Sequence, residues 1–156
     1  MTLEAGSPLP DLTAPDQEGT PRRLGDLLGP RGAVIYFYPK DNTPGCTLEA
    51  LEFQGVLAEL RALGVSLIGV SKDSSQSHAG FRTRRGLDFT LLSDQDGTLC
   101  QAFGAWKEKS MYGKRFMGIA RTTVVVDSQG AIRRIYSDVK AKGHAAAVLR
   151  DLRAVL

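Results

Sequence analysis

Two contrasting patterns of apolar residues follow each other in the first half of the chain. Residues 33–38 (AVIYFY) are all apolar, aromatic or β-branched, which predicts a strand that is buried on both faces and ends at Pro39. Between residues 46 and 63, leucines recur at helical spacing, which predicts an amphipathic helix that Gly64 stops. A second apolar run at residues 65–70 predicts another buried strand. This half of the chain therefore has the order strand, helix, strand.

Shorter helical and extended patterns alternate in the second half of the chain. They predict a helix over residues 77–85, a strand over 89–92, a short helix that carries Cys100, strands over 122–126 and 131–136, and a helix from residue 144 onward. The turn at residues 127–130 makes the two late strands a hairpin. Residues 106–120 are basic and interrupted by glycines, so we expect a loop that crosses the surface.

The order of these elements indicates the fold class. Strands that alternate with helices, followed by a hairpin and a closing helix, predict an α/β fold in which helices flank a central mixed β-sheet. The first 30 residues are rich in proline, glycine and aspartate, which predicts an extended arm with short strands. No repeat or linker divides the sequence, so we expect residues 1–156 to form a single domain.

The composition excludes several classes of protein. The content of 42% hydrophobic and 24% charged residues is ordinary for a globular domain. The excess of 20 Lys and Arg over 17 Asp and Glu leaves a charge of only +3, too little to indicate a nucleic-acid partner. No apolar segment approaches the roughly 18 to 20 residues of a membrane span, and the first residues show no secretory-signal pattern. We therefore expect a cytoplasmic protein with no membrane partner.

The two cysteines are the candidates for reactive chemistry. Two cysteines and two histidines, scattered along the chain, make a four-ligand zinc site improbable, so no metal is expected. Cys46 follows the first buried strand, where functional sites collect in α/β folds. Thr43 and Pro44 fit the cap and the first position of a helix, whose free N–H groups and dipole would stabilise a Cys46 thiolate. Two interpretations remain open: a nucleophile, or an inert buried cysteine.

The segment around Cys46 resembles the active-site signature of peroxiredoxins. Pro39, Thr43 and Cys46 match its Pro-x-x-x-Thr-x-x-Cys pattern, and the longer string FYPKDNTPGCTLEA resembles the bacterioferritin comigratory protein subfamily, also called peroxiredoxin Q. Five further strings fall in that family's order and approximate spacing: GVSKD at 69–73, LLSD at 91–94, FGAW at 103–106, KEKSMYG at 107–113 and RTT at 121–123. The resemblance therefore covers essentially the whole chain.

This resemblance implies a thioredoxin-like fold and a thiol-dependent peroxidase. Cys46 would be the peroxidatic nucleophile, which attacks hydrogen peroxide or an organic hydroperoxide, releases water or an alcohol, and becomes a sulfenic acid. Thr43 would bond to peroxide or thiolate, Arg121 would hold the thiolate ionised, and Pro39 would shield the sulfur from water. Glu49 also matches the family string and would support Arg121 or a backbone group.

The resemblance also implies the partners of the protein. Thioredoxin or a similar thiol donor would act as the reductant, and no cofactor is expected. The subgroup is often monomeric, so we expect a monomer, with a weak dimer as the alternative. His78 and His144 lie at the beginnings of helical segments and are expected at the surface. Four basic residues of the predicted loop could steer anionic substrates or a reductant: Lys107, Lys109, Lys114 and Arg115.

The sequence departs from the subfamily at the second cysteine. Many members carry a resolving cysteine five residues after the peroxidatic one, where this chain has Leu51, and others carry it on the following helix, which has none here. Three alternatives stay open: an external thiol recycles Cys46 directly, Cys100 resolves it after local unwinding of the first helix, or Cys100 acts on another subunit or in a different redox event. Without such a role, Cys100 is a small core residue.

Two other functions would use the same residues. A thiol–disulfide oxidoreductase on the same fold needs two nearby thiols, and the absence of a Cys-x-x-Cys motif argues against it. A redox-sensing interaction protein would instead use the oxidation of Cys46 to signal to a partner. The sequence favours the peroxidase and leaves sensing as an additional role.

Overall fold

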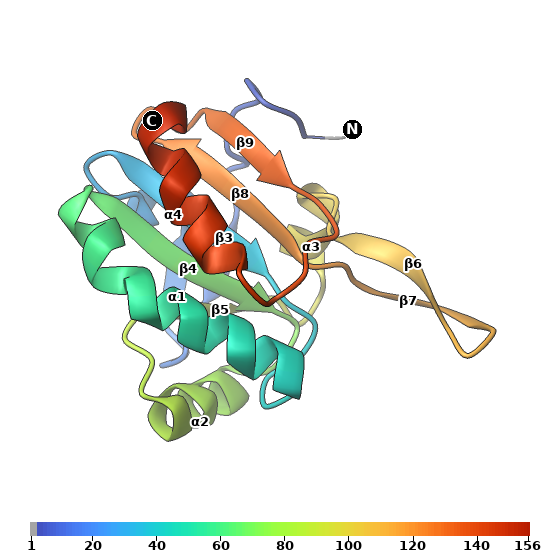
Figure 1. Cartoon of the computed structure of the whole chain (residues 1–156). Coiled ribbons are helices and arrows are strands. Elements are labelled where there is room, and N and C mark those ends of the chain that lie inside the picture. The colour runs from blue at the N-terminus through green and yellow to red at the C-terminus, as the bar shows by residue number, and fades with distance from the viewer. Residues whose placement is uncertain (1–2) are drawn as a thin grey trace.

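The centre of the protein is a mixed β-sheet, shown in Figure 1 by a computed structural model that describes residues 3–156. Its strands are β3 (Gly32–Phe37), β4 (Val65–Ser71), β5 (Thr90–Ser93), β8 (Thr122–Asp127) and β9 (Ile132–Tyr136). β4 pairs with β5 in parallel, whereas β8 pairs antiparallel with both β3 and β9. β3 lies beside β4, where Tyr38 N–H donates to the carbonyl of Val70 at 3.0 Å. The predicted mixed sheet is confirmed.

Three helices bury one face of this sheet. α1 (Pro44–Ala62) and α4 (His144–Val155) lie across the sheet in Figure 1, and α2 (Ser75–Arg85) lies beyond them at the side of β5. Their apolar residues join one core cluster with alternate residues of β3, among them Val34 and Tyr36. Within residues 3–156, no helix combines the length and apolar character needed to cross a membrane.

The other face of the sheet has its own core. The intervening β3 residues, Ala33, Ile35 and Phe37, face this second cluster, because successive side chains of a strand point to opposite faces. Three short elements contribute residues to it, β1 (Thr13–Pro15), the 3-10 helix η1 (Leu24–Leu27) and α3 (Thr98–Ala102), and β2 (Pro21–Arg23) pairs with β1. The continuous apolar run of residues 33–38 thus supplies both cores, and the predicted arm with short strands is confirmed.

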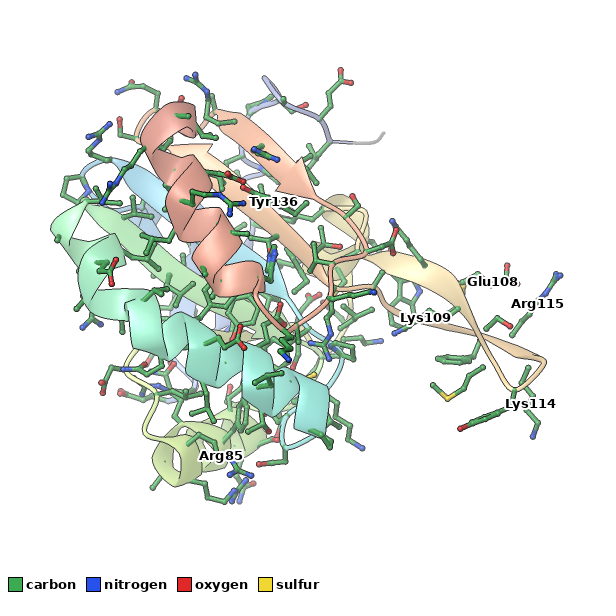
Figure 2. The ribbon with its side chains drawn as sticks, viewed as in Figure 1. Arg85, Glu108, Lys109, Lys114, Arg115 and Tyr136 are labelled. Atoms are coloured by element: carbon green, nitrogen blue, oxygen red, sulfur yellow. The ribbon has the colours of Figure 1, made fainter. Side chains whose placement is uncertain are left out.

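Residues 106–120 were expected to form a loop, and this prediction is wrong. They form a hairpin of β6 (Trp106–Met111) and β7 (Lys114–Ile119), which projects from the body of the protein. Figure 2 shows the side chains of Glu108, Lys109, Lys114 and Arg115 along it. Tyr112 and Gly113 have φ of +53° and +77° and make the two-residue turn. Most of β7 is exposed, so the hairpin has no buried apolar stripe whose periodicity the sequence could reveal.

Both histidines are buried, and the expectation that they lie at the surface is wrong. His78 is fully buried between Asp41 and the carbonyl of Leu92, within hydrogen-bond distance of each. His144 is 7% exposed and its Nε2 lies 2.8 Å from the Thr123 hydroxyl. Burial lowers the pKa of His144, so its ring stays neutral near pH 7. Each buried histidine has hydrogen-bond partners from distant segments of the chain: Asp41 and the Leu92 carbonyl for His78, and the Thr123 hydroxyl for His144.

Candidate active site

Cys46 lies in the first turn of α1, directly after the loop that follows β3. Thr43 is the cap residue, with extended φ and ψ of −81° and 153°, and Pro44 opens the helix. The first intrahelical hydrogen bond is donated by Thr47 N–H to the carbonyl of Thr43. The N–H groups of Gly45 and Cys46 lie before it, so they have no acceptor within the helix. Cys46 itself is only 1% exposed. The expected position of Cys46 at a helix N-terminus is present.

Arg121 contacts the sulfur of Cys46, although the two residues are far apart in the sequence. It lies in the short connection between β7 and β8, and its Nη2 donates to Cys46 Sγ at 3.3 Å. Its Nη1 donates to Glu49 Oε1 at 2.9 Å, and Glu49 lies one turn further along α1. The planar guanidinium therefore bridges the cysteine and the carboxylate with two fixed donors.

The three groups influence one another electrostatically. Burial raises the pKa of Glu49 to about 7, against the opposing effect of Arg121, and Glu49 Oε2 is buried without a hydrogen-bond partner among the described residues. Burial alone would lower the pKa of Arg121, but Cys46 and Glu49 raise it above its ordinary value. The guanidinium therefore keeps its charge beside the sulfur, while Glu49 is poised between its two protonation states near neutral pH.

The raised pKa of Glu49 predicts a specific dependence of stability on pH. Between pH 4.5 and pH 7 the unfolded chain has lost the Glu49 proton and the folded protein still holds it, so the free energy of unfolding falls as the pH rises. A shift of this size corresponds to on the order of 3 kcal/mol. Glu49→Gln should remove this slope. Urea unfolding of both proteins from pH 4.5 to 8 measures it, and parallel curves would contradict the assignment.

Gly45 is a site residue that the sequence interpretation missed. A Cβ on this glycine would lie 2.7 Å from Arg121 Nη2, closer than such atoms approach. The missing side chain therefore lets the guanidinium lie against the first turn of α1. The available signal was a glycine inside a helical segment, where it costs about 1 kcal/mol relative to alanine and needs a reason.

The Thr43 side chain does not cap α1, contrary to the expectation for its position. Its hydroxyl donates to the carbonyl of Lys40 at 2.8 Å, within the loop. Because the hydrogen is used there, the oxygen lone pairs are free to accept a hydrogen bond. This is the polarity needed to accept a hydrogen bond from the O–H group of a ligand.

Pro39 and Arg121 share the wall of a surface pocket of about 330 Å³, which Lys107 and Lys109 of β6 also line. Two of the four predicted basic residues thus border this pocket, whereas Lys114 and Arg115 lie toward the far end of the hairpin (Figure 2). A larger cavity of about 430 Å³ lies elsewhere, around Gly29, Arg61 and Phe89. Because Arg61 is about 22 Å along α1 from Cys46, that cavity is remote from the sulfur.

Cys100 lies on the other side of the sheet from Cys46. Cys46 belongs to the core cluster under α1 and α4, and Cys100 to the cluster that faces α3 and the N-terminal strands. Both thiols are free and buried. Burial raises the pKa of the Cys100 thiol, and Asp94 raises it further while accepting from Cys100 N–H at 2.8 Å. Bridging the two cysteines would require their Cα atoms to come within about 7 Å through the sheet.

Asp41, Asp73 and His78 are close enough together to hold a cation. Their ligand atoms are already engaged, however. Tyr38 and Ser77 hydroxyls donate to Asp41, and Asp73 Oδ2 accepts both from Asp41 N–H and from the Ser71 hydroxyl. These contacts favour a hydrogen-bonded cluster over a metal centre.

Comparison with known proteins agrees with this geometry. Residues 5–135 match the model of the AhpC/TSA family. A putative peroxiredoxin bcp of Coxiella burnetii is 44% identical, and the match covers 97% of this chain and all of that protein. Peroxiredoxin Bcp of Escherichia coli is 40% identical, and the match covers 97% of this chain and 96% of that protein. The solved structure of the Xanthomonas campestris bacterioferritin comigratory protein, known for alkyl peroxide reduction, is 43% identical and superimposes with a TM-score of 0.88 over 97% of this chain and 98% of that one.

The likeness extends from the active-site loop to the whole fold. The thioredoxin-like peroxiredoxin architecture implied by the sequence is confirmed by these structures. The chain therefore belongs to the AhpC/TSA family and, within it, to the peroxiredoxins called bacterioferritin comigratory protein or peroxiredoxin Q.

Proposed function

We propose that this peroxidase reduces hydrogen peroxide and organic hydroperoxides with Cys46 as its nucleophile. The thiolate attacks the terminal oxygen of the hydroperoxide, an S–O bond forms and the O–O bond breaks. The departing oxygen takes up a proton and leaves as water or an alcohol, and Cys46 becomes a sulfenic acid. The observation that carries this proposal is the 3.3 Å contact between Arg121 Nη2 and Cys46 Sγ at the buried start of α1.

The neighbouring groups have complementary roles in this step. Arg121 stabilises the thiolate and donates to the oxygen on which charge develops, together with the free N–H groups of the first turn of α1. The Thr43 hydroxyl accepts from the hydroperoxide. Pro39 has no N–H to compete for the sulfur and limits the access of water. Glu49 orients Arg121 and, when protonated, leaves the full positive charge of Arg121 to the sulfur.

Recycling is proposed to use an external thiol and no second cysteine of the chain. Leu51 occupies the position of the resolving cysteine of many relatives, and Cys100 is separated from Cys46 by the central sheet. Thioredoxin or a similar dithiol would attack the sulfenic acid directly. Monomeric state, a single domain and cytoplasmic location stay predictions.

Cys100→Ser is therefore expected to retain most of the turnover. The test is the intact mass of the wild type and of Cys100→Ser after one equivalent of peroxide. Both proteins should gain about 16 Da, the mass of one oxygen on a sulfenic acid. Turnover with dithiothreitol should agree within about twofold, as for a neutral change outside the site.

A different mass change would support another route. A loss of about 2 Da in the wild type only would indicate an internal disulfide and a resolving role for Cys100. Complete loss of turnover in Cys100→Ser would point the same way. A role as a redox sensor would add to this reaction, since it needs the same sulfenic acid.

A further inference from the structure

The side chain of Asp41 joins the loop before Cys46 to helix α2 inside the protein. Asp41 is 4% exposed and His78, on α2, is fully buried. His78 Nδ1 lies 2.7 Å from Asp41 Oδ2, and the Tyr38 hydroxyl donates to Asp41 Oδ1 at 2.6 Å. These contacts are separate from the bridge that Arg121 makes to the sulfur.

The partners of His78 and Asp41 define the hydrogen bonds of this pair. Its Nε2 lies 2.9 Å from the carbonyl oxygen of Leu92, which can only accept, so Nε2 carries a hydrogen. Burial alone would raise the pKa of Asp41, but His78 and two hydroxyl donors hold that pKa below its ordinary value. His78 and Asp41 therefore form a fully buried, hydrogen-bonded pair between α2 and the loop.

Other side chains of the segment from β4 to α2 hold the same loop. Ser77 Oγ donates to Asp41 Oδ2 at 2.9 Å, and Asp41 N–H donates to Asp73 Oδ2 at 2.9 Å. Arg84 donates from Nε and Nη2 to Asn42 Oδ1 at 3.3 and 3.2 Å. Asn42 has φ of +65°, in the left-handed region that non-glycine residues seldom adopt. These bonds keep the loop closed against α2.

An external thiol cannot reach Cys46 while the loop is closed. Cys46 is 1% exposed, whereas the attacking sulfur must come within about 2 Å of Sγ to form the S–S bond. In that step the S–O bond of the sulfenic acid breaks, and its hydroxyl leaves as water with the proton of the thiol. A second thiol then cleaves the mixed disulfide and restores Cys46. The loop or the first turn of α1 must therefore move, and the bonds to Asp41 oppose that movement.

We propose that His78, acting through Asp41, is a positioning residue that sets the balance between a closed loop for the peroxide step and an open loop for the external thiol. The proposal rests on the function proposed above for Cys46. The rate of the thiol step scales with the population of the open form, which is minor. The peroxide step uses the closed form, which predominates. Weakening the pair therefore accelerates recycling and changes the peroxide step little.

The test measures the two half-reactions separately in His78→Gln and Asp41→Asn. Reduction of the pre-oxidised protein by dithiothreitol should become about tenfold faster, and oxidation by hydrogen peroxide should stay within about twofold. The fraction of Cys46 converted to sulfinic acid, read as a gain of about 32 Da under turnover with excess peroxide, should fall. The matched control is His144→Gln, which removes a buried histidine away from the loop and should leave both rates unchanged.

Several outcomes would overturn the proposal. An unchanged thiol step, or an equal fall of both rates, would show that the pair has only a structural role. The double variant should be no faster than the faster single variant, because both remove the same interaction, and multiplied effects would contradict the pairing. If these variants do not fold, Ser77→Ala tests the same contact, because it removes one hydrogen bond to Asp41 and should accelerate the thiol step more weakly. An unchanged thiol step in Ser77→Ala would then contradict the proposal.

Failure of the proposed function is distinguishable from failure of this inference. If Cys46 is not the nucleophile, the wild type itself gains no oxygen at Cys46 after one equivalent of peroxide. If only the inference fails, the wild type is oxidised and reduced as proposed, and the His78 and Asp41 variants show no selective change in the thiol step.

Discussion

Replacing Cys46 by serine is expected to abolish hydroperoxide consumption, with a fall in rate of at least about 10³-fold. A serine hydroxyl is not ionised near neutral pH, so the first turn of α1 and Arg121 have no anion to stabilise. The variant also cannot form the S–O bond that splits the reaction into two steps. A peroxide-clearance assay with an excess of dithiothreitol measures the loss.

The control for this experiment is Cys100→Ser in the same assay. It removes a thiol of equal size that is equally buried, yet lies in the other core cluster. Far-UV circular dichroism and urea unfolding check that both variants fold. If Cys46→Ser kept the turnover of the wild type, the assignment of the nucleophile would be wrong.

Replacing Arg121 by alanine is expected to slow the reaction with peroxide by about 10² to 10³-fold. The change removes the donor 3.3 Å from the sulfur and the positive charge beside it. It also leaves Glu49 Oε1 without the partner at 2.9 Å, so that both oxygens of a buried carboxyl are unsatisfied. The second-order rate of Cys46 oxidation, measured under single turnover, reports this loss.

The Arg121→Lys variant separates the charge of Arg121 from its geometry. Lysine keeps the positive charge but has one ammonium group in place of the planar fork that reaches Cys46 and Glu49 together. We expect a rate between those of the alanine variant and the wild type. An Arg121→Ala rate within about twofold of the wild type would contradict the role of the guanidinium.

Local sequence patterns were sufficient to predict the strands and helices that form the two cores. The apolar run at residues 33–38 became β3, and the leucine repeat became α1, with Pro44 at its first position. These predictions succeeded because burial on both faces and a helical stripe each leave a periodic signal in a short window. The hairpin at residues 106–119 was missed, since its strands pair with each other away from the core and carry mostly exposed residues.

The contacts that join distant segments could not be read from the sequence. His78 has polar neighbours along the chain, and only the fold brings Asp41 and the Leu92 carbonyl to its ring. The need for glycine at position 45 likewise appears only when Arg121 lies against it. In both positions the deciding partner is more than ten residues away, beyond the reach of periodicity or capping rules.

The two cysteines show which features the sequence determined and which features only the tertiary structure decided. The sequence by itself determined that Cys46 begins a helix after a buried strand, and the resemblance implied Thr43, Pro39 and Arg121 as its partners. Only the tertiary structure decided that Arg121 contacts the sulfur and that Cys100 is separated from it. The reason is that the central sheet divides the interior into two cores, and the helices that carry the two cysteines, α1 and α3, pack against its opposite faces.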